Sequence, residues 1–93
     1  MSELIEKREV IISNKLGLHA RASAKLVGVA SRFTCDIILK KGEDTANAKS
    51  IMDVLILAAS QNTLIEMTTT GEDAVAALDA LEALINDKFG EGE

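Results

Sequence analysis

The chain has 93 residues, which is enough for one domain with a single core and too few for a two-domain enzyme. Hydrophobic residues make up 47% of the sequence but aromatic residues only 2%, which excludes the stacked-ring platforms of many single-stranded nucleic-acid binders. The formal net charge of -5 and the lack of a long uncharged apolar run argue against nucleic-acid binding and membrane insertion.

Charged and metal-ligating side chains are unevenly distributed. Residues 1–50 carry nine basic and six acidic side chains, whereas residues 51–93 carry one and nine. The chain contains one cysteine, Cys35, and one histidine, His19, so it can form neither an intramolecular disulfide nor a Cys/His zinc site. We therefore expect no metal and no other cofactor. Because the N-terminus is charged rather than apolar, we expect a cytoplasmic monomer without a signal peptide.

The first predicted elements are a strand and a helix. Residues 6–13 alternate as a half-buried strand, with Val10 and Ile12 on the inner face and Asn14 at its end. Residues 20–32 then show helical spacing, for which two phases remain open. The buried stripe contains either Ala20, Ala24, Val27 and Ala30, or Ala20, Ser23, Leu26, Val27 and Ala30.

A hairpin is predicted next. Residues 34–40 form a strand with Cys35, Ile37 and Leu39 in phase on one face. A polar turn at 41–44 leads to a short strand at 46–48. Because Cys35 is in phase with apolar neighbours, we expect a buried, unreactive thiol rather than a redox site.

The rest of the chain is predicted as helix, strand and helix. Ser50 caps a short helix that ends near Ala59, because Asp53 three residues later completes a capping pattern. The β-branched residues of 63–69 predict a strand, with Ile65, Met67 and Thr69 on one face. Residues 72–88 predict the last helix, with acids in its first turn and a lysine in its last. Its buried stripe is expected to contain Val75, Leu78, Leu81 or Glu82, and Ile85.

The resulting order, β-α-β-β-α-β-α, predicts the α+β class. We expect an open-faced β-sandwich, in which three helices cover one face of a four-stranded antiparallel sheet. Residues 1–89 are assigned to this single domain, and residues 90–93, GEGE, to a flexible acidic tail.

The start of the first helix breaks the capping rules that the other two predicted helices obey. Those two begin at Ser50 and Thr70, which supply a hydroxyl acceptor, and acidic side chains follow. The first helix instead has His19 at the cap position, Arg21 in its first turn and Lys25 one turn later. The backbone N–H groups, the positive end of the helix dipole and the Arg21 guanidinium would all converge on an anion bound there. The pattern therefore predicts a phosphate site.

His19 gives this site two possible roles, and the residues alone leave both open. A lone histidine is often structural, so the anion could be a ligand beside a passive ring. Imidazole is also a nitrogen nucleophile that is partly neutral near pH 7, so the ring could carry a phosphoryl group covalently. Gly17 permits a tight turn before the helix, and we expect Leu16 and Leu18 to anchor this loop with His19 pointing outward.

Two segments carry a resemblance to a known family. Residues 16–24 read LGLHARASA, and residues 48–52, about thirty residues later, read AKSIM. Together they resemble the HPr family, the histidine-containing phosphocarriers of the bacterial phosphoenolpyruvate:sugar phosphotransferase system, which serves sugar transport. The predicted order of elements agrees with that family over nearly the whole chain. One departure is Ala22, where the family often has proline.

The resemblance implies a phosphoryl carrier that is a protein substrate of other enzymes and not a stand-alone enzyme. It implies that His19 accepts a phosphoryl group on Nδ1 from phospho-enzyme I and passes it to an enzyme IIA of the sugar or the nitrogen-related branch. Arg21 and the backbone of Ala20 would hold the phosphate. Ser50 matches the serine that a regulatory kinase phosphorylates in many bacteria, although Asp53 would repel a phosphate there.

The resemblance also implies a docking surface for these partners. Ile51 and Met52 match the family's exposed apolar patch, and we expect Lys25 and Lys49 to steer an acidic partner. In the family geometry we expect the start of that second helix to lie beside His19. The alternative is a non-catalytic anion-binding or regulatory interaction module on the same fold.

Overall fold

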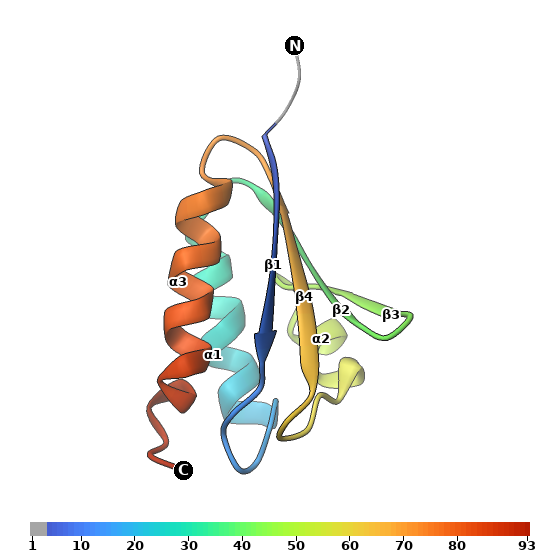
Figure 1. Ribbon diagram of the computed structural model, residues 1–93, viewed down its shortest axis with the longest axis vertical. Coiled ribbons are helices and arrows are strands. Elements are labelled where there is room, and N and C mark those ends of the chain that lie inside the picture. Colours follow the sequence, from blue (N-terminus) through green and yellow to red (C-terminus); the bar gives the residue numbers. More distant parts are fainter. Residues whose placement is uncertain (1–3) are drawn as a thin grey trace.

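The computed structural model describes residues 4–93 and confirms the predicted α+β architecture. Within these residues, three α-helices lie on one face of a four-stranded antiparallel sheet (Figure 1). The strands are β1 (Ile5–Ile11), β2 (Asp36–Lys41), β3 (Asp44–Asn47) and β4 (Leu64–Thr70). The helices are α1 (Ala20–Ala30), α2 (Ile51–Leu57) and α3 (Ala74–Asn86), followed by the short 3₁₀ helix η1 (Lys88–Gly90).

The first and last strands are neighbours in the sheet. The strand order is β1-β4-β2-β3, so β4 lies between β1 and β2 and runs antiparallel to both. The register pairs Val10 with Ile65 and Leu39 with Met67, which brings the inner residues of three strands into one layer. These inner residues, all predicted from the alternation, are buried: Val10, Ile12, Cys35, Ile37, Leu39, Ile65, Met67 and Thr69.

Helix α1 follows the second of its two predicted phases, with two changes. Ser23 and Leu26 are buried, and Ala24, which belongs only to the other phase, is exposed. Ala22 is also buried, whereas Ala20 is exposed, contrary to both phases. The buried face is therefore rotated toward Ala22, and the first residue of the helix stays accessible at the N-terminus.

Helix α3 begins later than predicted and without an acidic first turn. Thr70 is not its cap, because Thr70 is the last residue of β4. The carboxylate of Asp73 accepts hydrogen bonds from the backbone N–H groups of Thr34, at 2.8 Å, and Cys35, at 2.9 Å. Asp73 thus joins two loops instead of capping its own helix, and the helix starts at Ala74.

The face that α3 turns to the core also differs from the prediction. The expectation that Val75 is buried is wrong, since this side chain is 43% exposed. Lys88, expected in the last turn, lies in η1, because α3 ends at Asn86. Alanines take the place of Val75 in the core, and the buried residues of α3 are Ala74, Ala77, Leu78, Leu81 and Ile85.

Neither a membrane-spanning helix nor a metal cluster is found among residues 4–93. No helix there combines the length and the apolar character needed to cross a bilayer. The same residues hold no group of three or more His, Cys, Asp or Glu side chains placed to bind a metal ion.

Candidate functional site

His19 lies at the N-terminus of α1 and begins that helix. Its backbone is extended, with φ of -71° and ψ of 179°, and its carbonyl oxygen accepts the first helical bond, from the Ser23 N–H at 2.8 Å. Its side chain does not cap the helix, and no acid lies in the first turn. Within residues 4–93 the N–H groups of Ala20 and Arg21 have no hydrogen-bond acceptor. The helix start is therefore as the sequence predicted, with donors open to an anion.

Several hydrogen bonds hold the loop before His19. Leu18 donates its N–H to the carbonyl oxygen of Ala59 at 2.8 Å, which ties this loop to the segment after α2. The Ser23 hydroxyl donates to the Leu18 carbonyl at 2.9 Å, and the Asn14 amide donates to the Gly17 carbonyl at 2.8 Å. Leu18 is buried and anchors the loop as expected.

Leu16 does not anchor this loop, and that part of the expectation is wrong. Its side chain is 68% exposed. Gly17 between the two leucines has a φ of +65°, so the backbone reverses there and the two side chains point to different environments. Leu16 instead contributes an apolar surface beside the site.

The C-terminal tail supplies the partner of the histidine ring, which sequence reasoning missed. The Nε2 atom of His19 is hydrogen-bonded to Oε2 of Glu91. The Asn14 amide donates to Oε1 of the same carboxylate at 2.9 Å. The Asn14 bond, the His19 bond and the Arg21 charge hold the pKa of Glu91 below its ordinary value. Flexibility of residues 90–93 stays a prediction, since the contacts describe one arrangement of the tail.

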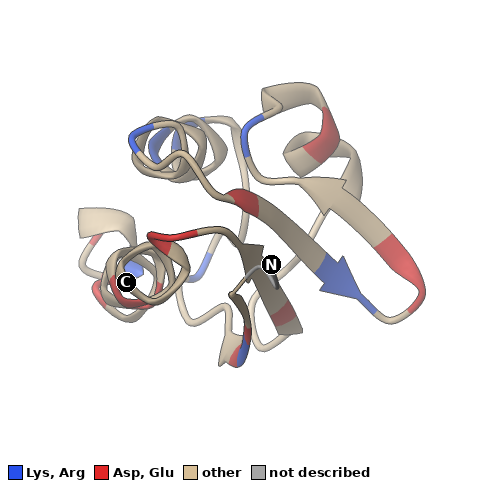
Figure 2. Cartoon of the chain, turned by 90° about the horizontal axis from the view of Figure 1, so that it is seen from above, with Lys and Arg blue, Asp and Glu red and all other residues tan. Residues whose placement is uncertain are grey.

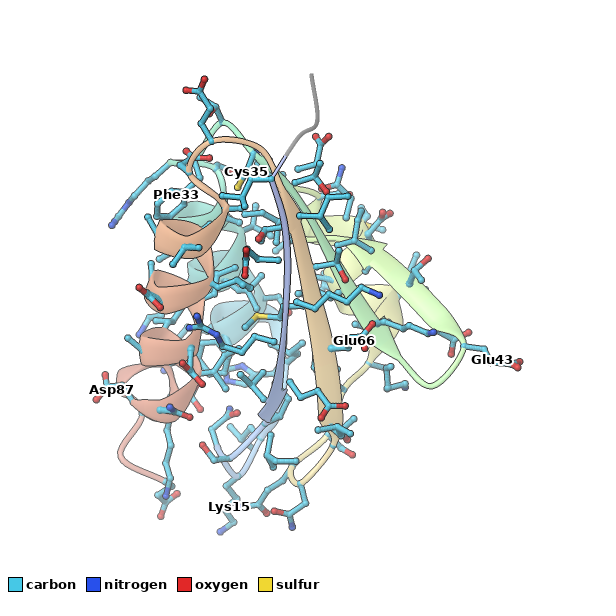
Figure 3. The ribbon with its side chains drawn as sticks, turned by 45° about the horizontal axis from the view of Figure 1, so that its top comes forward. Lys15, Phe33, Cys35, Glu43, Glu66 and Asp87 are labelled. Carbon is cyan, nitrogen blue, oxygen red and sulfur yellow. The ribbon has the colours of Figure 1, made fainter. Side chains whose placement is uncertain are left out.

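A cavity of about 320 Å³ opens between this tail and the start of α1. Arg21 is exposed on its wall and makes no hydrogen bond within residues 4–93, so its guanidinium is free to meet an anion. Lys25 donates to the carbonyl oxygen of Phe89 at 2.6 Å. In Figure 3, Lys15 marks this end of the molecule. The lining residues are Lys15, Leu16, Arg21, Lys25, Gly90, Glu91 and Glu93.

The charges of the chain are separated between two helices. Figure 2 shows basic residues on α1 and acidic residues on α3. α1 contains Arg21 and Lys25 and no acid, whereas α3 contains Asp79 and Glu82 and no base. The positive end of the α1 dipole adds to its basic side chains. Both acids of α3 are paired with Arg8 of β1, whereas α1 has no acid of its own, so an approaching acidic surface is attracted to α1.

Ser50 caps α2 as predicted, but the start of α2 does not lie beside His19. Lys49 donates to the carbonyl oxygen of Phe33 at 2.7 Å, beyond the C-terminal end of α1. Phe33 lies near the opposite end of the molecule from Lys15 (Figure 3). The contact between Ala59 and the His19 loop shows that α2 approaches the site with its C-terminal end. The start of α2 thus lies toward the C-terminal end of α1, contrary to the expectation from family geometry.

The cap itself has the predicted geometry. The Ser50 hydroxyl accepts a hydrogen bond from the Asp53 N–H at 3.3 Å. The Asp53 carboxylate accepts in turn from the Asn47 N–H at 3.2 Å, at the end of β3. This bond gives Asp53 a structural role at the junction of β3 and α2.

Apolar side chains are exposed along α2. Met52 is 61% exposed and Ile51 is 37% exposed, and the sequence singled out both for docking. It missed Ile56, which is 74% exposed and follows Met52 by one turn on the same face. The spacing of four residues between Met52 and Ile56 was the sequence signal that could have identified Ile56. Large apolar side chains exposed together commonly mark a protein contact.

Cys35 lies apart from this site. It is buried at the start of β2, and burial raises the pKa of its thiol to about 11, with a further contribution from the neighbouring Asp73 carboxylate. A thiol of this kind stays protonated near neutral pH and is a poor nucleophile, in line with the predicted unreactive thiol.

Comparison with known proteins assigns the family. Residues 6–87 match the family model described as the PTS HPr component phosphorylation site. The chain belongs to the HPr family. It is a phosphoryl carrier of the phosphotransferase system and not a stand-alone enzyme, and the comparisons give no support to a non-catalytic module.

Individual HPr proteins match over almost their full length. The chain is 52% identical over 87 residues to the phosphocarrier protein HPr of Pseudomonas putida, covering 92% of this chain and 97% of that protein. It is 48% identical to the HPr of Neisseria meningitidis serogroup A, covering 94% and 98%. A crystal structure of HPr from Thermoanaerobacter tengcongensis matches with a TM-score of 0.90 at 41% identity, covering 92% and 97%.

Proposed function

We propose that His19 is the residue that carries the phosphoryl group, and that Nδ1 is the atom that accepts it. The observation that carries this proposal is the asymmetry of the ring. Nε2 is engaged by Glu91, whereas Nδ1 makes no hydrogen bond within residues 4–93. The free nitrogen belongs to a residue that directly precedes the open N–H groups of α1.

In the transfer, the Nδ1 lone pair attacks phosphorus while the bond from phosphorus to the donor breaks, and the phosphoryl group moves with its three oxygens. We propose phospho-enzyme I as the donor and an enzyme IIA as the next acceptor, which takes the group by the same in-line step in reverse. The N–H groups of Ala20 and Arg21 and the Arg21 guanidinium stabilise the charge on those oxygens.

The partners dock on α1 and α2 in this proposal. Ile51 and Met52 supply the apolar contact, and Lys25 and Lys49 add positive charge around it. Both lysines also bond backbone carbonyls, so their ammonium groups hold fixed positions. Ser50 is the proposed site of a regulatory serine kinase. The carrier works as a cytoplasmic monomer.

Intact-mass analysis tests the covalent step. Incubation with phosphoenolpyruvate and enzyme I should add one phosphoryl group, and brief acid treatment should remove it, because phosphohistidine hydrolyses in acid while phosphoserine survives. The His19→Ala variant should gain no mass and should still fold, since the His19 side chain does not cap the helix and is only partly buried. A His19→Ala protein that gains an acid-labile phosphoryl group would place the site elsewhere.

A further inference from the structure

The tail carboxylate of Glu91 is held in place from several sides. Phe89, two residues earlier, is 1% exposed in the core and anchors the tail. Its carbonyl oxygen accepts from the Lys25 ammonium at 2.6 Å. The Lys15 N–H donates to the carbonyl oxygen of Glu93 at 3.0 Å, two residues after Glu91. Backbone contacts therefore fix the chain on both sides of the residue that touches His19.

Asn14 connects this carboxylate to the loop that carries His19. Asn14 is fully buried, and its amide nitrogen donates both to the Gly17 carbonyl, at 2.8 Å, and to Glu91, at 2.9 Å. Its two N–H bonds thus link the turn before His19 to the group that binds the ring. Both oxygens of Glu91 are used, one by Asn14 and one by the His19 Nε2.

We propose that Glu91 is a positioning residue for phosphoryl transfer, an inference that rests on the proposed role of His19. Its carboxylate accepts the Nε2–H bond and so fixes the ring in the tautomer that leaves the Nδ1 lone pair available. When the bond from Nδ1 to phosphorus forms, the ring becomes cationic, and the carboxylate stabilises that charge without taking the proton. When the phosphoryl group leaves, the electron pair returns to Nδ1.

The tautomer is directly observable, because the chain has a single histidine and its imidazole nitrogens give unambiguous ¹⁵N signals. In the native protein with a neutral ring, we expect the signals of an Nε2–H tautomer. In Glu91→Ala they should move toward the averaged positions of two exchanging tautomers. Asp87→Asn is the matched control, since it removes one negative charge from an exposed side chain near the same end of the chain, outside the cavity lining, and leaves the Nε2 contact intact.

Transfer kinetics give the second measurement. Glu91→Ala should lower kcat for acceptance from phospho-enzyme I about tenfold with little change in KM, the effect of one charge-assisted hydrogen bond. Glu91→Gln should not rescue the rate. An amide has one oxygen acceptor and so cannot serve both the Asn14 and the His19 donors. The Asp87→Asn control should keep the native kcat.

The outcomes separate this proposal from the one on which it rests. Unchanged ¹⁵N signals in Glu91→Ala, or a native kcat, would overturn the positioning role. Faster transfer in Glu91→Ala would also overturn the positioning role and would mean that Glu91 blocks access to the phosphate site. If the tautomer shifts in Glu91→Ala but enzyme I does not phosphorylate the native protein, the contact between Glu91 and His19 stands and the carrier role of His19 is refuted.

Discussion

The carbonyl oxygen of Ala59 lies 2.5 Å from the point that a Cβ atom would occupy at Gly17. Gly17 also has a φ of +65°, a conformation that residues with a side chain rarely adopt. The segment after α2 thus packs directly on the backbone of the loop that presents His19. Only glycine satisfies both the close approach and the turn.

Gly17→Ala should therefore destabilise the protein and displace the site together. The strained φ alone costs about 1–3 kcal/mol, and the clash with Ala59 adds to it. The free energy of unfolding, measured with denaturant, and the rate of phosphoryl acceptance should both fall. Gly42→Ala is the control, because Gly42 has a similar φ of +60° with no atom within 4 Å of the added Cβ. It should lose stability without losing rate; equal rate losses in the two variants would contradict a local role for Gly17.

Sequence patterns predicted those features that depend on neighbours along the chain. Alternation placed Ile65 and Met67 inside the sheet, and capping chemistry singled out the start of α1 at His19. The Ser50 cap follows from a contact across three residues. Each of these needs only local geometry, which the strand and helix periods fix.

Such patterns could not predict features that depend on packing between distant parts of the chain. The exposure of Val75 follows from where α3 starts, and that start is decided by the bonds from Asp73 to the loop at Thr34, 39 residues away. The contact of Glu91 with His19 spans 72 residues. An acidic, glycine-rich tail carries no periodic signal of its partner, so composition could not predict this contact.

Arg21→Glu should slow acceptance from phospho-enzyme I by about tenfold or more, because a charge-assisted donor is replaced by a like charge beside the phosphate. Arg32→Glu makes the same change of charge beyond the other end of α1 and serves as the control. Quenched time courses of phosphoryl uptake, recorded at several salt concentrations, provide the measurement. Native rates should fall between about 50 and 500 mM salt, as surface charges become screened. Equal losses in both variants would indicate general charge steering in place of a phosphate contact.

Asp73→Asn should destabilise the fold near neutral pH, and the difference from the native protein should shrink in acid. Hydrogen bonds from the Thr34 N–H, and then from Cys35, hold the pKa of Asp73 below its ordinary value of 3.8. A group with a depressed pKa contributes stability that is present above that ordinary value and is lost as the pH falls through the folded value. Urea unfolding from pH 7 to pH 2 should show the two curves converging below about pH 4. Exposed Glu72→Gln is the control and should not reproduce this convergence.

Ser50→Ala and Ser50→Asp should separate the structural role of this residue from a regulatory one. Alanine removes the acceptor of the Asp53 N–H and should cost about 1 kcal/mol, whereas aspartate keeps an acceptor at a helix start that favours negative charge. This end of α2 lies toward the C-terminal end of α1, where Lys49 bonds the Phe33 carbonyl, and His19 lies at the other end of that helix.

An added charge at Ser50 should therefore act on the approach of an acidic partner and not on the chemical step. We expect Ser50→Asp to raise KM for phospho-enzyme I about tenfold at low salt with kcat unchanged, while Ser50→Ala leaves both close to native. Because the repulsion is between surface charges, about 500 mM salt should remove most of the difference. Initial rates at several concentrations of each variant, with melting curves alongside, provide the measurement. A reduced kcat with an unchanged KM would mean that Ser50 influences the transfer itself, and equal KM values for both variants would leave Ser50 as a helix cap alone.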